Sequence, residues 1–494
     1  MKFRVKDLDL ATGGPHIAAL HKKDARHIDS RSGDRIIVKY GKKEVTCILD
    51  IAESKRELAP GSIGLFEEVL DKLKVKNGSI VELKFTGKPE SVNHIREKLF
   101  GKQLCYEQLF RIADDITNDR LTEIEKTYFV SACFAHGLSI REIVDLTKAL
   151  VLTGDKLKFG KLTLDKHCIG GIPGNRTTMV VIPIIAAAGF IIPKTSSRAI
   201  TSPAGTADTM ECLAKVELPP QKIKKIVKKN GACIVHGGSM NLAPADDKII
   251  EVEHPLSIDA EGQLLASVLA KKYSVSADHV LIDIPMVKSS KAKNWKEANH
   301  LKERFELIGK KLGMNVKVIV TDGSRPIGRG IGPLFEAEDV MSVLRNDSHA
   351  PQDLRKKALF MAGVLLEMTG KYKKGEGEKA AIQILNSGKA WVKMNNIIDA
   401  QGRQKKPPRG KFTFCMNSNK TGKIIAVDND IVAKIARIAG CPQDKGAGLI
   451  LHKNVGDLVK KGELLYTVYA YNQFKLNLAK ELICLNCGYG VEKS

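Results

Sequence analysis

A glycine-rich segment at residues 165–178 has the composition of a phosphate-binding loop. Its flexible backbone positions are Gly170, Gly171 and Gly174. Its two positive charges are Lys166 and Arg176. The glycines allow backbone N–H groups to converge on an anion, and the helix predicted to follow would add its positive N-terminal end. A Walker A loop needs Gly-Lys-Ser/Thr in succession, but Asn175 separates the last glycine from the arginine, which disfavours nucleoside triphosphate hydrolysis. The alternative is a tight structural turn with exposed basic residues.

A second segment, residues 195–211, concentrates hydroxyl groups after a β-type run. Its polar side chains include the hydroxyls of Ser196, Ser197, Thr201, Ser202 and Thr206 and the guanidinium of Arg198. Open α/β sheets bind ligands at the carboxyl ends of their strands, and hydroxyl and guanidinium groups suit sugar and phosphate oxygens. The alternative is a Ser/Thr-rich loop that caps the next helix.

Together the two segments resemble the signature of the thymidine phosphorylase family, also called nucleoside phosphorylase class II. The matching motifs are Lys166-His167-x-x-Gly170-Gly171 and Ser196-Ser197-Arg198-Ala199-Ile200-x-x-Pro203-Ala204-Gly205-Thr206-x-Asp208-x-Met210-Glu211. Pro203 and Met210 stand where that signature usually has a small and an aliphatic residue. The match covers essentially the whole chain and is longest to the archaeal AMP phosphorylase branch, which has an extra N-terminal β domain. It implies that the Gly-x-Gly-x-Gly run in residues 325–333 is a structural loop rather than a dinucleotide site.

The resemblance implies phosphorolysis of nucleoside 5′-monophosphates in nucleotide salvage or degradation: AMP and phosphate would give adenine and ribose 1,5-bisphosphate. Inorganic phosphate would be a co-substrate, with no metal and no cofactor. The substrate-binding residues would be Gly171, Ser197, Arg198, Ala199, Ile200, Thr201, Ser202, Thr206, Ser267 and Lys291. The attacking phosphate would be held by Lys166 and Ser196.

A third segment, residues 254–272, would supply the proton donor. If Asp259 opens a helix, Ser267 and Lys271 lie four residues apart and share a face. By resemblance, Asp259 protonates the departing base, whereas the residues alone favour a helix N-cap, which is a common role of Asp. Pyrimidine-specific relatives have an arginine fifteen positions before this serine, where this chain has Val252.

Two segments depart from the family pattern: the loop that ends at Lys291, which bears on substrate preference, and the glycine-rich segment at Cys168. Where the archaeal branch usually reads Ile-Pro-x-Gly-x-Gly-Ala-Lys, this chain has Val287, Ser289 and Ser290 in place of Gly, Gly and Ala, and retains Lys291. Cys168 stands where bacterial relatives have a phosphate-binding serine, and a thiol is a weaker hydrogen-bond donor.

These segments must be positioned by helices and strands, and the sequence pattern predicts a multi-domain α/β and α+β protein. The 494 residues are too many for one core. Short β-type runs predict an N-terminal β-rich domain at residues 1–88, and helical periodicity predicts a helical domain at 89–160 with a second piece at about 250–275. Alternating strands and helices predict a central α/β domain at 161–375, followed by a C-terminal α+β domain at 376–494. By resemblance, the active site would lie between the helical and α/β domains of a homodimer or larger homo-oligomer.

Composition points to a cytoplasmic protein with anionic partners. The net charge is +23, and ten scattered cysteines indicate a reducing compartment. Residues 179–192 form the longest apolar run, which is too short to span a membrane, and the charged N-terminus lacks a signal-peptide core. Cys484 and Cys487 have ligand-like spacing, but no second pair exists for a structural zinc site, which favours a free dithiol or reversible disulfide.

Two other functions remain open at this stage. A pyrimidine nucleoside phosphorylase is the alternative enzyme. A nucleic-acid-binding protein would explain the charge, but aromatic residues are only 5% and the basic run at residues 222–229 has the spacing of a solvated helix face. We therefore expect no nucleic-acid partner.

Overall fold

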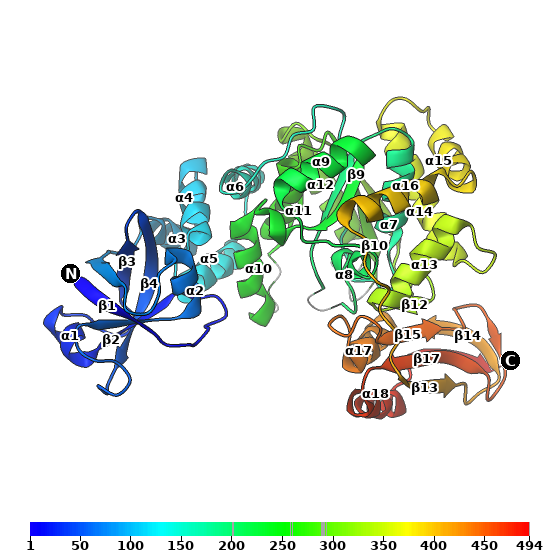
Figure 1. Cartoon of the computed structure of the whole chain (residues 1–494). Helices are drawn as coiled ribbons and strands as arrows, with labels where there is room; N and C mark the ends of the chain where they lie inside the picture. The colour runs from blue at the N-terminus through cyan, green and yellow to red at the C-terminus, as the bar shows by residue number, and fades with distance from the viewer. Residues whose placement is uncertain (200–201, 257, 259, 288–291, 293, 494) are drawn as a thin grey trace. The chain divides into compact units, whose positions relative to one another are not determined.

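The computed structural model describes residues 1–199, 202–256, 258, 260–287, 292 and 294–493. The chain divides into two compact units, Met1–Thr153 with Pro244–Ser267 and Gly154–Ala243 with Val268–Ser494 (Figure 1). The first unit contains the N-terminal and helical domains, and the second contains the central and C-terminal domains.

The N-terminal domain is a closed barrel with strand order β1-β5-β2-β4-β3-β6. Some of its strands alternate buried apolar with exposed residues, as in β6, where Val81 and Leu83 are buried. This confirms the predicted β-rich domain. The bounds are β1 (Lys2–Asp7), β2 (Ile17–His21), α1 (Lys22–His27), β3 (Arg35–Tyr40), β4 (Lys43–Ala52), β5 (Ser62–Leu65), α2 (Glu67–Leu73) and β6 (Ile80–Phe85).

The helical domain packs α10 against α4 and α5. Thr122 and Ser139 begin α5 and α6 in capping boxes, each with a glutamate three residues later. One of these glutamates, Glu142, also forms a buried ion pair with Lys98, with 2.7 Å between Glu142 Oε1 and Lys98 Nζ. The bounds are α3 (Ser91–Leu99), α4 (Tyr106–Thr117), α5 (Glu123–His136), α6 (Ile140–Leu152), α10 (Pro244–Leu256) and α11 (Glu261–Ser274), and α11 continues into the second unit.

The central domain is built on parallel strands. Strand β10 pairs in parallel with β11 and with β7, and β8 pairs in parallel with β9. A parallel bridge from Thr163 to Ile191 connects these two groups of strands. The strand bounds are β7 (Leu164–Cys168), β8 (Ile192–Ser196), β9 (Ala232–His236), β10 (His279–Met286) and β11 (Asn315–Asp322). The expected α/β arrangement is therefore present.

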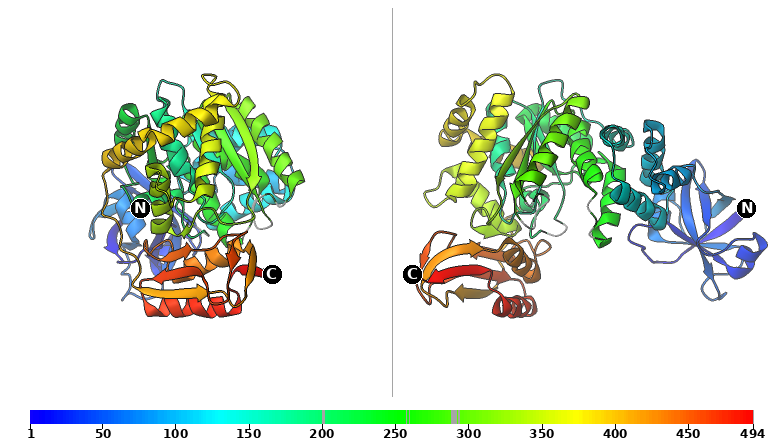
Figure 2. Two further views of the ribbon diagram at one scale, coloured as in Figure 1. Left: turned by 90° about the vertical axis from the view of Figure 1, so that its right-hand side faces the viewer. Right: turned by 180° about the vertical axis from the view of Figure 1, so that it is seen from behind.

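Helix α7 lies at the centre of this domain. It is apolar all round and fully covered, because α14 and α16 pack against it (Figures 1 and 2). It accounts for most of the long apolar run in the sequence. The surrounding bounds are α7 (Thr177–Ala187), α8 (Thr206–Glu211), α9 (Pro220–Asn230), η1 (Gly238–Met240), α12 (Trp295–Lys311), β12 (Gly330–Ile331), α13 (Pro333–Arg345), α14 (Gln352–Met368), α15 (Glu376–Asn386) and α16 (Lys389–Gln401).

Helices α15 and α16 belong to the central core, although the sequence boundary at 375/376 assigns them to the C-terminal domain. Leu385, Met394 and Ile397 are fully buried in the same apolar cluster as α7 and α14. Their helical periodicity alone does not show which core they join.

The C-terminal domain combines two small sheets with two helices. The sheets have the orders β12-β15-β17-β13 and β16-β14-β18. Cys484 is exposed and Cys487 half-buried, and both are free thiols. The bounds are β13 (Phe412–Asn417), β14 (Gly422–Val427), α17 (Asn429–Ala439), β15 (Gly448–Leu451), β16 (Leu458–Val459), β17 (Leu464–Ala470), α18 (Gln473–Leu485) and β18 (Tyr489–Lys493).

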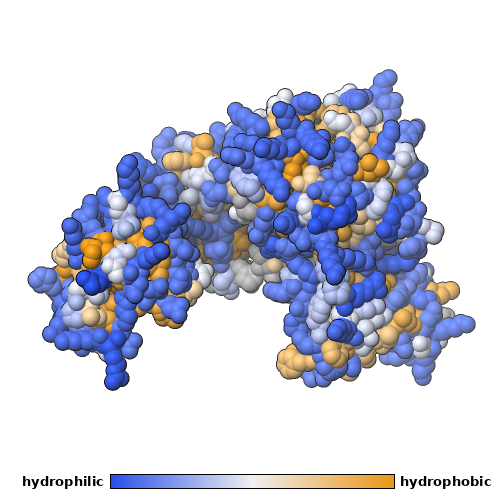
Figure 3. Space-filling model, in the orientation of Figure 1, coloured by the Kyte–Doolittle hydropathy of each residue, from blue (hydrophilic) through white to orange (hydrophobic). Residues whose placement is uncertain are grey.

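Within the described part of the chain, no helix has the length and apolar character needed to cross a bilayer. Hydrophilic residues cover most of the face seen in Figure 3, with smaller hydrophobic patches between them.

Candidate functional site

The two loops singled out by the sequence enclose one cavity in the second unit. The glycine-rich loop follows β7 and ends where α7 begins, and the hydroxyl-rich loop follows β8 and ends where α8 begins. Because neighbouring parallel strands place their carboxyl ends at the same edge, both loops border a cavity of about 300 Å³. Seven predicted residues line it: Gly171, Ser196, Ser197, Arg198, Ala199, Ser202 and Thr206.

The glycine-rich loop depends on a close backbone approach. Gly174 has φ +72°, and a Cβ atom there would lie 2.0 Å from the carbonyl oxygen of Ile327. The Ile327 N–H in turn donates to the carbonyl of Pro173 at 3.1 Å. A residue with a side chain does not fit at position 174 unless the loop moves.

The hydroxyl-rich loop is closed by the carboxylate of Asp208, which is 2% exposed. One oxygen, Oδ2, accepts from the backbone N–H groups of Ala199 at 2.7 Å and Gly205 at 2.9 Å. A Cβ atom on Gly205 would lie 2.7 Å from the carbonyl oxygen of Ser197. The first turn of α8, which contains Asp208, therefore fixes the loop.

Arg176 joins the two loops. Its guanidinium donates to the carbonyl of Ala204 and forms an ion pair with Glu336. A third nitrogen donates to the hydroxyl of Thr206 at 3.4 Å. Burial raises the pKa of Glu336, and the ion pair with Arg176 acts in the opposite direction. Arg176 thus holds the loops together, a role that sequence reasoning missed because Glu336 is 160 positions away.

Arg198 lines the cavity, but three carboxylates engage its charge. Its guanidinium lies 2.8 Å from Glu211, 2.7 Å from Glu217 and 3.4 Å from Asp208. The hydrogen bond from Arg198 is the main cause that lowers the pKa of Glu211 to about 2. In this arrangement the guanidinium stabilises the loop.

Lys194 lines the cavity, whereas Lys166, which the sequence predicts to hold phosphate, does not. Lys166 is 1% exposed, and its Nζ donates to the hydroxyls of Thr177 at 3.0 Å and Thr178 at 3.2 Å. The Nζ of Lys194 donates to the carbonyl of Lys166 at 2.6 Å and lies 3.6 Å from Asp165. Burial, followed by the neighbouring charge of buried Lys272, lowers the pKa of Lys194 to about 7.

A usable signal for Lys194 existed in the sequence. Alternate residues of a strand share a face, so Lys194 shares one with Ser196, which was predicted to bind phosphate. Because Lys194 lies in an otherwise apolar run, the pattern of residue types alone does not single it out.

Cys168 is part of a buried polar cluster at the end of β7. Its Sγ donates to Asp283 Oδ2 at 3.3 Å and accepts from Asn175 Nδ2 at 3.3 Å. Burial raises the pKa of the thiol to about 12, so it stays protonated. Asp283 also accepts from Thr321 at 2.6 Å and pairs with Lys357 at 3.2 Å.

Ser267 and Val252 belong to the first unit and are not among the residues that line this cavity. The Ser267 hydroxyl donates to Asp246 at 2.8 Å. Val252 is buried in α10. Four predicted residues lie outside the described residues: Ile200, Thr201, Asp259 and Lys291. Their roles stay predictions.

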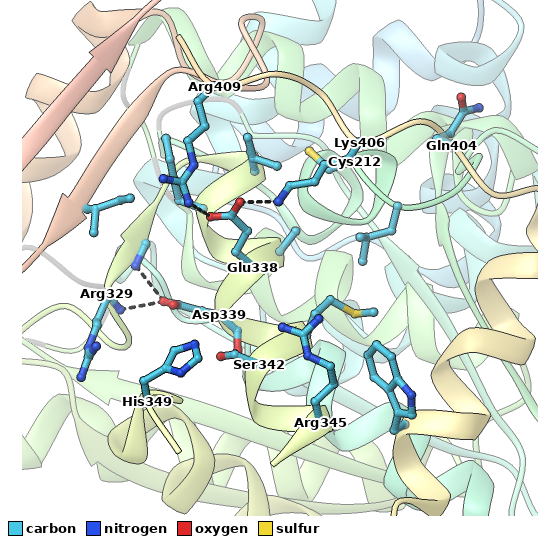
Figure 4. A pocket seen from close by; sticks show the side chains of 18 of the residues that line it. Cys212, Arg329, Glu338, Asp339, Ser342, Arg345, His349, Gln404, Lys406 and Arg409 are labelled. Carbon is cyan, nitrogen blue, oxygen red and sulfur yellow. Dashed lines mark hydrogen bonds and ion pairs between the residues drawn. The ribbon is translucent and has the colours of Figure 1, made fainter. Parts of the chain in front are cut away.

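A larger cavity of about 640 Å³ lies between α13, α16 and the segment leading into β13 (Figure 4). Glu338 pairs there with Lys406 at 2.6 Å and Arg409 at 2.8 Å. Asp339 accepts the backbone N–H groups of Arg329 and Gly330, both at 2.7 Å. Asp339 therefore anchors the glycine run of residues 325–333, in keeping with a structural loop.

Comparison with known proteins matches three parts of the chain to family models. Residues 92–154 match the helical bundle domain of the glycosyl transferase family, and residues 160–391 match its a/b domain. Residues 424–487 match the pyrimidine nucleoside phosphorylase C-terminal domain.

Similar proteins span nearly the whole chain. A protein of Legionella pneumophila (strain Corby) named "Putative thymidine phosphorylase" is 44% identical over 486 residues, 97% of this chain and 93% of the relative. AMP phosphorylase 1 of Archaeoglobus fulgidus is 42% identical over 475 residues, 95% of this chain and 93% of the relative.

Among solved structures, anthranilate phosphoribosyltransferase from Thermus thermophilus is similar with a TM-score of 0.53. It is 18% identical, and the alignment covers 62% of this chain and 98% of that protein. This likeness concerns the fold alone.

Proposed function

Because the chain belongs to the thymidine phosphorylase family of nucleoside phosphorylases, a family of pentosyltransferases, we propose that it cleaves nucleoside 5′-monophosphates with inorganic phosphate. AMP is the proposed substrate, and adenine and ribose 1,5-bisphosphate are the proposed products.

The cavity between the two loops is the observation that supports this proposal most directly. It presents hydroxyls, backbone N–H groups and the ammonium of Lys194, which suit the oxygens of a phosphate and a phosphorylated sugar. Its carboxylate neighbour Asp208 is engaged with the loop backbone, so its charge does not oppose a bound anion directly.

In the proposed reaction, a phosphate oxygen attacks C1′ of the ribose as the bond from C1′ to the base nitrogen breaks. Positive charge develops at C1′ and negative charge on the departing base, as in other glycosidic cleavages. We assign Asp259 to donate a proton to the base, and the phosphate to the face of the sugar opposite the base. The direct displacement requires no covalent intermediate.

Two observations favour AMP over a pyrimidine nucleoside. The Archaeoglobus relative is named an AMP phosphorylase, and Val252 stands where pyrimidine-specific members have a base-binding arginine. The alternative is a thymidine or uridine phosphorylase. It is favoured by the names of other relatives and by the match of residues 424–487.

A substrate panel tests the choice. Purified protein is incubated with AMP, CMP, UMP, thymidine or uridine, with and without phosphate, and released base is quantified. We expect adenine release from AMP only with phosphate present. Release without phosphate, or a higher kcat/KM for thymidine than for AMP, contradicts the proposal.

A further inference from the structure

A lysine-rich cavity of about 600 Å³ lies at the opposite edge of the central sheet from the candidate site. It is formed where the chain enters β7, β8 and β9, together with α9 and α16. These two helices, labelled in Figure 1, pack against each other. Six lysines from three segments line it: Lys158, Lys161, Lys224, Lys228, Lys229 and Lys393. Phe159 and Phe190, both half-buried, add apolar surface.

The positive charges of this lysine cavity are not paired with negative charges of the described residues. No carboxylate is among its described lining residues, and none of the six ammonium groups forms an ion pair or hydrogen bond with a described residue. The cavity in Figure 4 differs, because Glu338 there pairs with two cations and Arg345 pairs with Asp347 at 2.8 Å. Crowded like charges repel, and a bound anion of several charges would relieve that repulsion.

Helix α9 explains only part of the cluster. Lys228 and Lys229 lie in its last turn, where cations interact favourably with the helix dipole. Lys158, Lys161 and Lys393 come from other elements and gain nothing from α9. The dipole of α9 therefore does not account for the presence of these three lysines at the cavity.

The lysine cavity is separate from the candidate site. Strands β7, β8 and β9 have five residues each, so the two edges of the sheet are about 16 Å apart at ~3.3 Å per residue. A ligand here would not contact the loops that follow these strands.

We propose that the lysine cavity binds a small anion with several phosphate groups, of the nucleoside triphosphate class, with its base against Phe159 and Phe190. Lysine ammonium groups are common phosphate ligands, and a concave volume of this size is typical of small-molecule sites. The aromatic surface favours a nucleotide over a bare polyphosphate. This inference does not rest on the proposed function.

The test uses pairs of lysines from the same helix. Lys224 and Lys228 line the cavity, whereas Lys222 and Lys225 are exposed on α9 and do not line it. ATP binding to the full chain is measured by isothermal titration calorimetry for wild type, K224Q/K228Q and K222Q/K225Q. All four lysines are exposed, so both variants should fold, which thermal unfolding checks.

We expect saturable binding by wild type, at least tenfold weaker binding by K224Q/K228Q, and a change of less than twofold in K222Q/K225Q. Equal weakening in the two variants, which lose the same charge, would assign the effect to net charge and overturn the proposal. So would an absence of ATP binding by wild type at millimolar concentration, or binding that K224Q/K228Q leaves unchanged, as expected if ATP occupies only the candidate site.

Two further arms define the ligand class. F159A should weaken ATP binding severalfold and leave inorganic tripolyphosphate binding unchanged. Equal effects on both ligands would show that Phe159 does not contact the base, and would overturn the assignment of a nucleotide to the cavity. A single-stranded oligonucleotide that binds the same lysines with affinity rising steeply with length would show a polymer surface instead of a small-molecule site.

Discussion

Lys194 lies inside a strand, yet its side chain borders the cavity between the two loops. With a pKa lowered to about 7, its amine is mostly charged below that pH and mostly neutral above it. Phosphate is attracted by the charged form alone. We therefore expect phosphate binding at the candidate site to depend on pH near neutrality.

We predict that Lys194→Met raises the KM for phosphate roughly tenfold at about pH 6, the order expected for one charge-assisted hydrogen bond. The wild-type KM should rise as pH increases through about 7, whereas the variant should lack this contribution and keep only that of phosphate ionisation. Steady-state kinetics across this range measures both. Parallel profiles of log KM against pH would show that Lys194 does not act on phosphate.

Asp259 carries the proton-transfer step of the proposed function. Asp259→Asn cannot donate a proton and should lower kcat with AMP by ~10²–10⁴-fold, while the KM for AMP changes only a fewfold. Initial rates with saturating phosphate give both constants. If kcat remains at the wild-type level, Asp259 is a helix cap and the donor is another group.

At the scale of elements, the two loops depend on residues that prevent them from moving. Gly174 permits contact with the segment at Ile327, and Arg176 and Asp208 fix the loop backbones from the inside. Loops held this way are preorganised, so less conformational entropy is lost when a ligand binds.

Gly174→Ala tests this rigidity, with Gly313→Ala as its control. Both glycines have similar positive φ values, +72° and +77°, and the strain should cost about 1–2 kcal/mol in each variant. Only the Cβ at position 174 meets backbone, at 2.0 Å, whereas position 313 has nothing within 4 Å. We expect Gly174→Ala to lower kcat/KM at least tenfold, and Gly313→Ala to lower only the thermal midpoint. Equal kcat/KM values would show that the loop adapts freely.

The sequence predicted the location of the loops better than the roles of their charges. Strand alternation and the glycine and hydroxyl clusters are local patterns, so they placed both loops at strand ends. The pairing of Arg176 with Glu336, and of Arg198 with Glu217, depends on tertiary contacts that a local pattern does not contain. The sequence assigned α15 and α16 to the wrong domain for the same reason. The apolar face of a helix does not show which core it packs against.

At the scale of the whole molecule, the charge of +23 is distributed between paired and unpaired cations. In the first unit, basic groups from the barrel and α10 converge on Asp119, in the turn between α4 and α5. Lys72 lies 2.7 Å from its carboxylate, Lys248 forms a closer ion pair, and His16 lies 3.8 Å away. Burial raises the pKa of Asp119, but the two lysines outweigh it and the pKa is lowered.

Asp119→Asn should therefore weaken the attachment of the barrel to the helical domain. Removing the carboxylate leaves the converging cations uncompensated, and we expect a loss of roughly 1–3 kcal/mol, or about 2–4 °C in the thermal midpoint for each kcal/mol. Because the pKa of Asp119 is lowered, its contribution to the free energy of unfolding is complete above the ordinary carboxyl pKa of 3.8 and is lost as pH falls through the lowered value. The difference in stability between the variant and wild type should therefore narrow in acid.

Asp71→Asn, on the exposed face of α2, is the control. It removes the same charge without an ion pair to a described residue and should change stability by less than about 0.5 kcal/mol. Equal effects of the two substitutions at neutral pH would show that net charge, rather than this cluster, determines stability.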